Sequence, residues 1–132
     1  MFFKKITYAN RKIVSKLNEI LKPFNVNATD WRVFAYLSST KSASLSEICE
    51  FYQMDKALVS RVCKKLENFE YIEYSSSSDK REKIISLSLK GKELYFDAHL
   101  LISEYEKQVS MDLDYAEFGM FINILDKINK KL

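Results

Sequence analysis

Residues 44–91 constrain the fold more than any other part of the sequence, because two short helical patterns are followed there by a polar hairpin. Ser44 and Glu47 have the spacing of a capping box, so a helix is predicted to begin at this point. Asp55 can cap a second helix, which is predicted to run to about residue 69. Two helices in this arrangement can place the second one in a DNA major groove.

The second helix has two chemically different faces when its residues are plotted at about 100° per residue. An apolar inner face and an outer face of small and basic side chains suit a helix that enters a DNA major groove. The inner face consists of Val59, Val62, Cys63 and Leu66. The outer face consists of Ala57, Ser60, Arg61 and Lys64, flanked by Lys56, Leu58 and Lys65.

This part of the chain resembles the winged helix-turn-helix of the MarR family of bacterial transcription regulators. Two departures are visible. Glu70 stands where the family often has glycine, and Glu73 and Tyr74 follow Ile72 where the family often has a basic residue. The matching segments, in chain order, are Thr29-Asp30-Trp31, Ser44–Cys49, Val59-Ser60-Arg61, Leu66-Glu67, Tyr71-Ile72, Asp79-Lys80-Arg81, Leu87-Ser88 and Gly91.

The resemblance implies a mainly α (α+β) fold within a single domain of residues 1–132. A winged helix-turn-helix lobe would occupy residues 29–91, with dimerisation helices in residues 1–28 and 92–132. The resemblance also implies a wing that contacts DNA. Arg81 would reach into the minor groove, where a narrow A·T tract concentrates negative potential, and Asp79 would hold Arg81 in place. Lys83 is a further cation expected at the wing.

Charge is distributed unevenly along this chain of 132 residues, whose net charge is only +3. Residues 54–66 hold four cations against one aspartate, and residues 79–92 hold five cations against two acids. Residues 93–132 hold four basic and eight acidic residues. Positive charge therefore gathers at the predicted groove helix and wing, as expected of a surface that binds nucleic acid.

Periodicity predicts the remaining helices, and a content of only two glycines and one proline argues against an all-β fold. An amphipathic first helix is predicted to end at or before Pro23. A second helix is predicted from a Thr29 cap to about Ser39. A long helix is predicted from about Leu89 to Val109, and a last helix is predicted after an Asp114 cap.

Two strands are predicted from apolar residues that alternate with polar ones. The first contains Ile72 and Tyr74, and the second contains Ile85, Leu87 and Leu89. The four serines at 75–78, together with Asp79, are predicted to form the tip of the hairpin.

The terminal helices carry apolar stripes that a single subunit of this size would leave partly exposed. Burial of apolar surface stabilises by roughly 25 cal/mol per Å², so a two-fold dimer through these helices is predicted. A dimer would present two groove helices to a pseudo-palindromic duplex, with half-sites about 34 Å apart. The stripes consist of Ile6, Ile13, Leu17 and Ile20 in the first helix, and of Phe118, Phe121, Leu125 and Ile128 in the last.

Four aromatic residues have two interpretations. Relatives in the resembled family bind small aromatic molecules between the dimerisation helices and the DNA-binding lobe. Phe24, Trp31, Tyr36 and Tyr95 are candidates to line such a pocket. Aromatic side chains also dominate ordinary cores, so core packing is the alternative.

The two cysteines and the single histidine carry no recognised site. Cys49 and Cys63 fall on predicted inward faces, where cysteine acts as a small hydrophobe, with redox sensing as the alternative. Their unrelated positions suggest reduced thiols and a cytoplasmic protein. His99 is assigned to a helix surface, and neither a metal site nor a cofactor is predicted.

Catalytic and membrane-spanning classes are disfavoured. The sequence has no Gly-rich phosphate loop and no Cys-His or Ser-His pairing supported by a motif, so the chain is predicted not to be an enzyme. No apolar run approaches the length of a membrane span, and the N-terminus lacks a signal-peptide layout.

These observations lead to the hypothesis of a homodimeric regulator that binds duplex DNA sequence-specifically and acts as a repressor. A small aromatic effector is a further expected partner. A rival interpretation is a winged-helix module that binds protein through the same face; the acids Glu67, Glu70 and Glu73 favour it. A third is a ligand-binding dimer that has lost DNA binding. The residues expected to contact DNA are Lys56, Ala57, Leu58, Ser60, Arg61, Lys64, Lys65, Asp79, Arg81 and Lys83.

Overall fold

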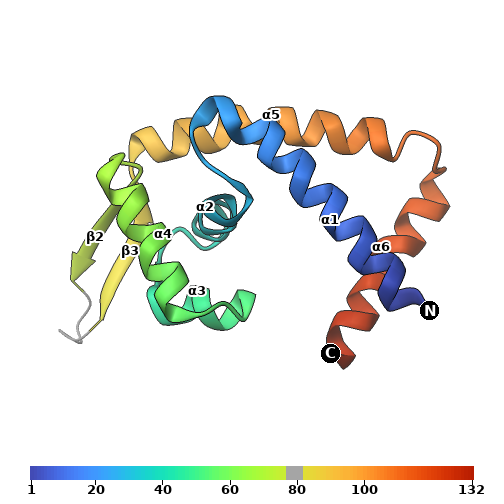
Figure 1. Cartoon of the computed structure of the whole chain (residues 1–132), viewed down its shortest axis with the longest axis horizontal. Coiled ribbons are helices and arrows are strands. Elements are labelled where there is room, and N and C mark those ends of the chain that lie inside the picture. The colour runs from blue at the N-terminus through green and yellow to red at the C-terminus, as the bar shows by residue number, and fades with distance from the viewer. Residues whose placement is uncertain (77–81) are drawn as a thin grey trace. The chain divides into compact units, whose positions relative to one another are not determined.

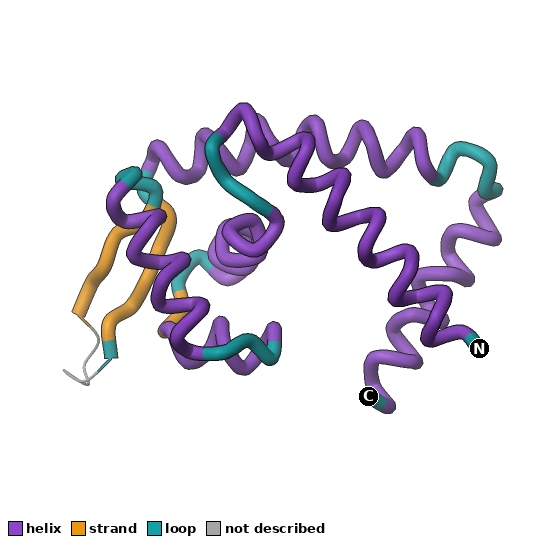
Figure 2. Tube along the Cα trace, viewed as in Figure 1, coloured by secondary structure: helices purple, strands orange, loops and turns teal. Residues whose placement is uncertain are grey.

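The computed structural model describes residues 1–76 and 82–132, which divide into two compact units, Met1–His99 and Leu100–Leu132 (Figure 1). Helices dominate both units, which confirms the predicted mainly α class (Figure 2). The first unit contains α1 (Phe2–Leu21), the 3-10 turn η1 (Lys22–Phe24), α2 (Ala28–Thr40), β1 (Ala43–Ser44), α3 (Leu45–Tyr52), α4 (Lys56–Asn68), β2 (Ile72–Ser76), β3 (Lys83–Leu87) and the first part of α5 (Leu89–Val109). The second unit contains the rest of α5 and α6 (Tyr115–Lys131).

The strands form a three-stranded antiparallel sheet in the order β1-β3-β2. Ile72 pairs with Leu87, and Ala43 pairs with Ile85 on the other side of β3. The two-residue strand β1 was not predicted, because two residues are too few to show an alternating pattern. Two further expectations were wrong. β2 extends through Ser76, so the first two serines belong to the strand, and Leu89 belongs to α5 because the strand ends at Leu87.

The start of α2 also differs from the prediction. Asn27, and not Thr29, is the N-cap. The side-chain oxygen of Asn27 accepts the backbone N–H of Asp30 at 2.9 Å, and the Asp30 carboxylate accepts the backbone N–H of Asn27 at 2.9 Å. This reciprocal pair satisfies two donors at the helix start, whereas Thr29 already lies inside the helix.

The core of the first unit forms where α2, α3 and α4 meet the sheet, as Figure 1 shows. Phe34 on α2, Ile48 on α3, Leu66 on α4 and Ile85 on β3 are fully buried. Leu21, the last residue of α1, is also fully buried. These contacts join the helix-turn-helix to the hairpin, and they therefore fix the position of the hairpin strands relative to α4.

The C-terminus of α4 is closed by a Schellman motif whose left-handed residue is Glu70. The backbone N–H of Tyr71 donates to the Leu66 carbonyl at 2.9 Å, and that of Glu70 donates to the Glu67 carbonyl at 2.8 Å. Glu70 has a φ of 64°, a conformation that favours glycine. The departure noted in the sequence at this position is therefore accommodated at the expense of backbone strain.

Glu70→Gly is expected to raise the free energy of unfolding by about 1 kcal/mol, because glycine adopts this φ without a Cβ clash. Chemical denaturation measures the change. Glu93→Gly is the matched control, since residue 93 is exposed within α5 and glycine there should destabilise by about 1 kcal/mol. Equal effects of the two changes would contradict the role given to Glu70.

The turn after α4 is tied to the start of α5. The Ser88 hydroxyl donates to the Glu70 carbonyl at 2.6 Å and accepts the Gly91 backbone N–H at 3.0 Å. The Ser88 backbone N–H donates to the Tyr71 carbonyl at 3.0 Å. A Cβ at Gly91 would lie only 2.1 Å from that carbonyl oxygen, so the close approach of α5 requires glycine.

The second unit exposes much of its apolar surface. Asp114 caps α6 as predicted and forms a capping box with Glu117. No residue of α6 is buried within the chain. Large apolar residues that are exposed on α6 include Phe118, Met120, Phe121, Ile122 and Ile124.

Candidate nucleic-acid interface

The two faces of α4 are those that its periodicity predicted. Val59, Val62, Cys63 and Leu66 are buried. Leu58 and Lys65 at the flanks are half-buried. The small and basic residues between them are exposed, so they can reach an extended partner. The exposed outer residues are Lys56, Ala57, Ser60, Arg61 and Lys64.

Local caps hold α3 and α4 in a helix-turn-helix. The Ser44 hydroxyl accepts the Glu47 backbone N–H at 3.2 Å at the start of α3. The Asp55 carboxylate accepts the Ala57 backbone N–H at 2.7 Å at the start of α4. Gln53 ends α3 with a left-handed φ of 51°, and the two helices pack against each other. Both predicted cap residues are therefore correct.

The base of the hairpin is linked to α4 through Tyr74 on β2. The side chain of Glu67 on α4 is close enough to Tyr74 to contribute to its pKa shift. Burial, with smaller contributions from Cys63 and Glu67, raises the pKa of Tyr74 to about 12, so its hydroxyl is neutral at physiological pH. The ammonium of Lys83 lies 5.2 Å from the centre of the Tyr74 ring, within cation–π range. The predicted wing residues Asp79 and Arg81 lie outside the described residues.

A groove of about 310 Å³ lies between the start of α3, α4 and the hairpin. It carries both signs of charge, with Lys56 and Lys83 facing the same space as Glu67 and Glu82. The described residues that line it include Ser44, Leu45, Ser46, Lys56, Ser60, Glu67, Tyr74, Glu82, Lys83 and Ile85.

Lys56, Ser60 and Lys83 line this groove and were predicted from the sequence as site residues, whereas the other lining residues named above were not. Among the others, Ser46 lies on α3, Tyr74 on β2 and Glu82 just before β3, so no single periodicity joins them. Glu67 gave a detectable signal, because it follows Ser60 by seven residues and therefore lies on the same side of α4.

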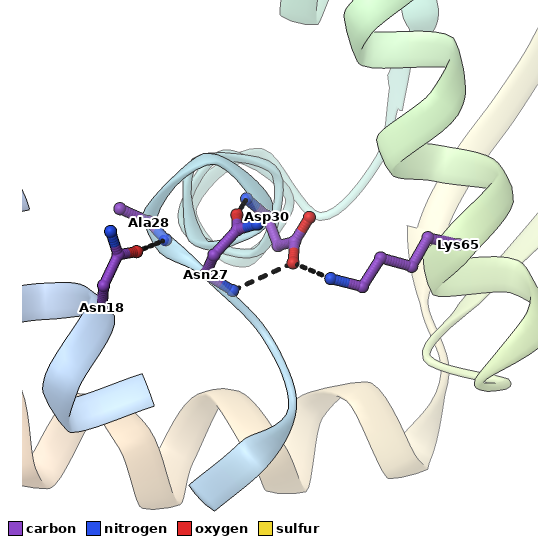
Figure 3. A network of polar contacts seen from close by, with 5 residues as sticks. All are labelled: Asn18, Asn27, Ala28, Asp30 and Lys65. Carbon is purple, nitrogen blue, oxygen red and sulfur yellow. Dashed lines mark hydrogen bonds and ion pairs between the residues drawn. The ribbon is translucent and has the colours of Figure 1, made fainter. Parts of the chain in front are cut away.

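Lys65 has a partner inside the protein, as Figure 3 shows. Its ammonium lies 2.6 Å from a carboxylate oxygen of Asp30, which is only 2% exposed. The same oxygen accepts the Asn27 backbone N–H in the α2 capping box. The neighbouring backbone N–H of Ala28 donates to the Asn18 side chain on α1 at 2.7 Å. The structure thus gives Lys65 a role in joining α4 to α2, although the sequence suggested a DNA contact.

The four aromatic candidates for an effector pocket take part in several ring contacts. Trp31 stacks on Tyr95, with ring centres 4.9 Å apart, and Tyr95 stacks on His99. Tyr36 instead contacts Phe51, at 5.0 Å, and Tyr52. Phe24 is half-buried in the turn after α1.

The cysteines have the character of small core residues. Cys63 is buried, and burial, with smaller contributions from Cys49 and Glu67, raises its pKa to about 11. The thiol is therefore protonated at neutral pH and is a poor nucleophile. Cys49 is half-buried, and both cysteines are free.

Among residues 1–76 and 82–132, no group of three or more His, Cys, Asp and Glu side chains could hold a metal ion. Within the same residues, no helix is long and apolar enough to cross a membrane.

Comparison with known proteins places this geometry in a family. A sequence model of the MarR family matches residues 24–82. The crystal structure of a MarR/EmrR family transcriptional regulator from Acinetobacter sp. ADP1 is 34% identical and superposes with a TM-score of 0.87, covering 98% of this chain and 92% of that one. The chain therefore belongs to the MarR family of transcriptional regulators. This membership confirms the prediction that it is not an enzyme.

Other relatives agree over different parts of the chain. The HTH-type transcriptional regulator YwoH of Bacillus subtilis, itself uncharacterised, is 26% identical over 81% of this chain and 78% of its own length. The regulator Hpr of Bacillus licheniformis is 33% identical over 83% of this chain, which spans about half (54%) of Hpr. A mutant MarR from E. coli in complex with operator DNA has the same fold, with a TM-score of 0.84 at 20% identity over 95% of this chain and 91% of that one.

Proposed function

We propose that this chain is a sequence-specific, duplex-DNA-binding regulator that represses transcription as a homodimer on a pseudo-palindromic operator. In this proposal α4 is the recognition helix, and the lobe at residues 29–91 carries the DNA contacts. Arg61 contacts base edges, because arginine can donate two hydrogen bonds to guanine. Lys56, Lys64 and Lys83 contact phosphates, and Ser60 serves a phosphate or a base edge.

The observation that carries the proposal is the exposed outer face of α4. Ala57 and Ser60 are small enough to permit close approach, and Arg61 and Lys64 extend beyond them on the same face. The operator complex of E. coli MarR supports this assignment through the shared fold. Arg81 and Asp79 remain proposed wing contacts on the strength of the family resemblance alone.

The direct test is selection of duplexes from a random pool by the full chain, followed by fluorescence anisotropy on selected and scrambled duplexes. Specific binding should exceed nonspecific binding by at least about 10³-fold at physiological salt. Failure of any duplex to be enriched, or equal affinity for both duplexes, would overturn the proposal.

The homodimer is proposed from the apolar surface of the terminal helices, residues 1–28 and 92–132. Phe2 and Ile13 on α1 are 56% and 55% exposed, and Phe121 on α6 is 51% exposed. Such surface on both terminal segments marks an association site. The closed symmetry of a two-fold dimer would bury it without forming open chains.

Sedimentation equilibrium at micromolar concentration is expected to give twice the chain mass of 15.5 kDa. Phe121→Lys should shift the protein toward monomer, because the charge could not be buried in an apolar interface. Lys127→Ala, which removes an exposed charge from the same helix, is the control and should leave the dimer intact. A folded wild-type monomer would contradict the dimer and with it the paired half-sites.

A protein-binding module is the second candidate, favoured by one observation. Glu67 and Glu82 line the groove beside α4, and acidic side chains there would repel a phosphate backbone. This candidate predicts weak, sequence-independent DNA binding, so the selection experiment separates the two candidate functions.

A small aromatic effector is also part of the proposal. Of the four predicted pocket residues, the stacked pair Trp31 and Tyr95 is the part that we retain as its binding site.

A further inference from the structure

We infer that Asp30 is a positioning residue for DNA recognition, which sets the recognition helix α4 through its ion pair with Lys65. The inference rests on the proposed function. It assigns Lys65, next to the proposed phosphate ligand Lys64, to an ion pair within the protein, although the Lys65 side chain is half-buried. It also makes specific binding depend on a carboxylate that does not face the DNA-binding surface.

The geometry of the pair is that of a strong charge-assisted contact. The Lys65 ammonium and an Asp30 carboxylate oxygen are 2.6 Å apart, and Asp30 is 2% exposed (Figure 3). A carboxylate removed from water to this extent needs a cation or several donors. Lys65 supplies the cation, and the backbone N–H of Asn27 supplies a further donor at 2.9 Å.

Apolar packing alone restricts the rotation of α4 about its axis less than this ion pair does. Val59, Val62 and Leu66 bury α4, but dispersion and hydrophobic contacts have little directional preference. An ion pair with hydrogen-bond geometry is directional, and removing one partner leaves the other charge buried without compensation. The pair therefore fixes the rotation of α4 about its axis, and with it the direction in which Ser60 and Arg61 point.

The start of α2, to which the ion pair joins α4, is itself held by several hydrogen bonds. Asn27 and Asp30 cap α2 reciprocally, and the Asn18 side chain on α1 accepts the backbone N–H of Ala28 at 2.7 Å. Figure 3 shows α1, the start of α2 and α4 joined through these residues. The Asp30 carboxylate thus joins α4 to the start of α2, and the neighbouring Asn18–Ala28 hydrogen bond joins α2 to α1.

DNA binding by Asp30→Asn, Lys65→Met and the double variant tests the inference. Asparagine can still accept the Asn27 N–H, and methionine keeps the length of the lysine stem, so each change removes mainly the charge. Each single variant should lose about tenfold in specific affinity per folded molecule, and the double variant should lose less than the product of the two. Affinity for nonspecific DNA should change little, so the ratio of specific to nonspecific affinity should fall.

The salt dependence of binding separates a positioning residue from a phosphate ligand. Lys65→Met should leave the slope of log K against log salt unchanged. A Lys65 that contacts phosphate would instead reduce the slope by about 0.9 and weaken both duplexes alike. That result, or wild-type specific affinity in Asp30→Asn, would overturn the inference.

Hydrogen exchange gives a readout that does not depend on DNA. In Asp30→Asn, amides of residues 62–68 should exchange about tenfold faster, because local opening of α4 becomes easier. Glu117→Gln is the matched control: it makes the same change at the equivalent position of the α6 capping box and should leave these amides unchanged. Wild-type exchange of α4 in Asp30→Asn would overturn the inference. If the wild-type protein bound no duplex, the proposed function would fail, and exchange alone would decide the role of Asp30.

Discussion

Gly91→Ala is expected to lower the free energy of unfolding by about 3 kcal/mol or more. The new Cβ would lie 2.1 Å from the Tyr71 carbonyl oxygen and 3.1 Å from the carbonyl carbon. Both atoms belong to backbone, so no flexible side chain can move aside, and the start of α5 must shift. Overpacking typically costs about 1–3 kcal/mol, and occasionally more. The shift would also break the hydrogen bonds of Ser88 to Glu70 and to Tyr71.

Gly119→Ala is the matched control. Gly119 lies inside α6, and a Cβ there would meet nothing within 4 Å. Alanine should therefore stabilise the protein by roughly 0.5–1 kcal/mol, because glycine is a poor residue for a helix interior. Thermal and urea denaturation of both variants give the two values. Two changes of the same sign and size would contradict the assigned contact at Gly91.

Arg61→Ala is expected to weaken binding to a selected duplex by about 1–3 kcal/mol, or up to roughly a hundredfold, if Arg61 makes a bidentate contact with a base. Binding to a scrambled duplex should weaken much less. Lys64→Ala, at a proposed phosphate contact, should weaken both duplexes more equally and reduce the salt slope by about 0.9. Anisotropy titrations on the two duplexes at several salt concentrations measure all of these quantities.

Arg11→Ala provides the control for charge alone. Arg11 is an exposed arginine on α1, so its loss changes the net charge by the same amount without touching α4. The affinity of the Arg11→Ala variant for the selected duplex should remain close to that of the wild-type protein. Equal losses in Arg61→Ala and Arg11→Ala would mean that the effect is one of overall charge, and the recognition-helix assignment would then be wrong.

Several features of the molecule were predictable because they depend only on neighbouring residues. Asp55 and Asp114 cap the helices that follow them, and a 3.6-residue period separates the buried Val59 and Val62 from the exposed Ser60. The long helix spans Leu89–Val109 as its pattern indicated. Caps and periodicity act over one or two helical turns, so the sequence alone is enough to locate them.

Other features follow from partners that are distant in the chain. Lys65 and Asp30 are 35 residues apart, and only the packing of α4 on α2 brings the Lys65 ammonium to the buried Asp30 carboxylate. The strand β1 exists because Ala43 meets Ile85 on β3. The ring partners of Trp31 and Tyr36 follow from tertiary structure in the same way, since Trp31 stacks on Tyr95 of α5 and Tyr36 contacts Phe51 of α3.

The sequence by itself thus determined the helices, the two faces of α4 and the family, since these rest on local spacing and on residue order. The tertiary structure decided which exposed cations are free to meet a partner. It also showed why residue 91 must be glycine, because the requirement comes from the carbonyl of Tyr71, 20 residues earlier, and not from the helix α5 in which Gly91 lies. A close approach between two backbones has no local signature, because it is set only when the hydrophobic core brings the two segments together.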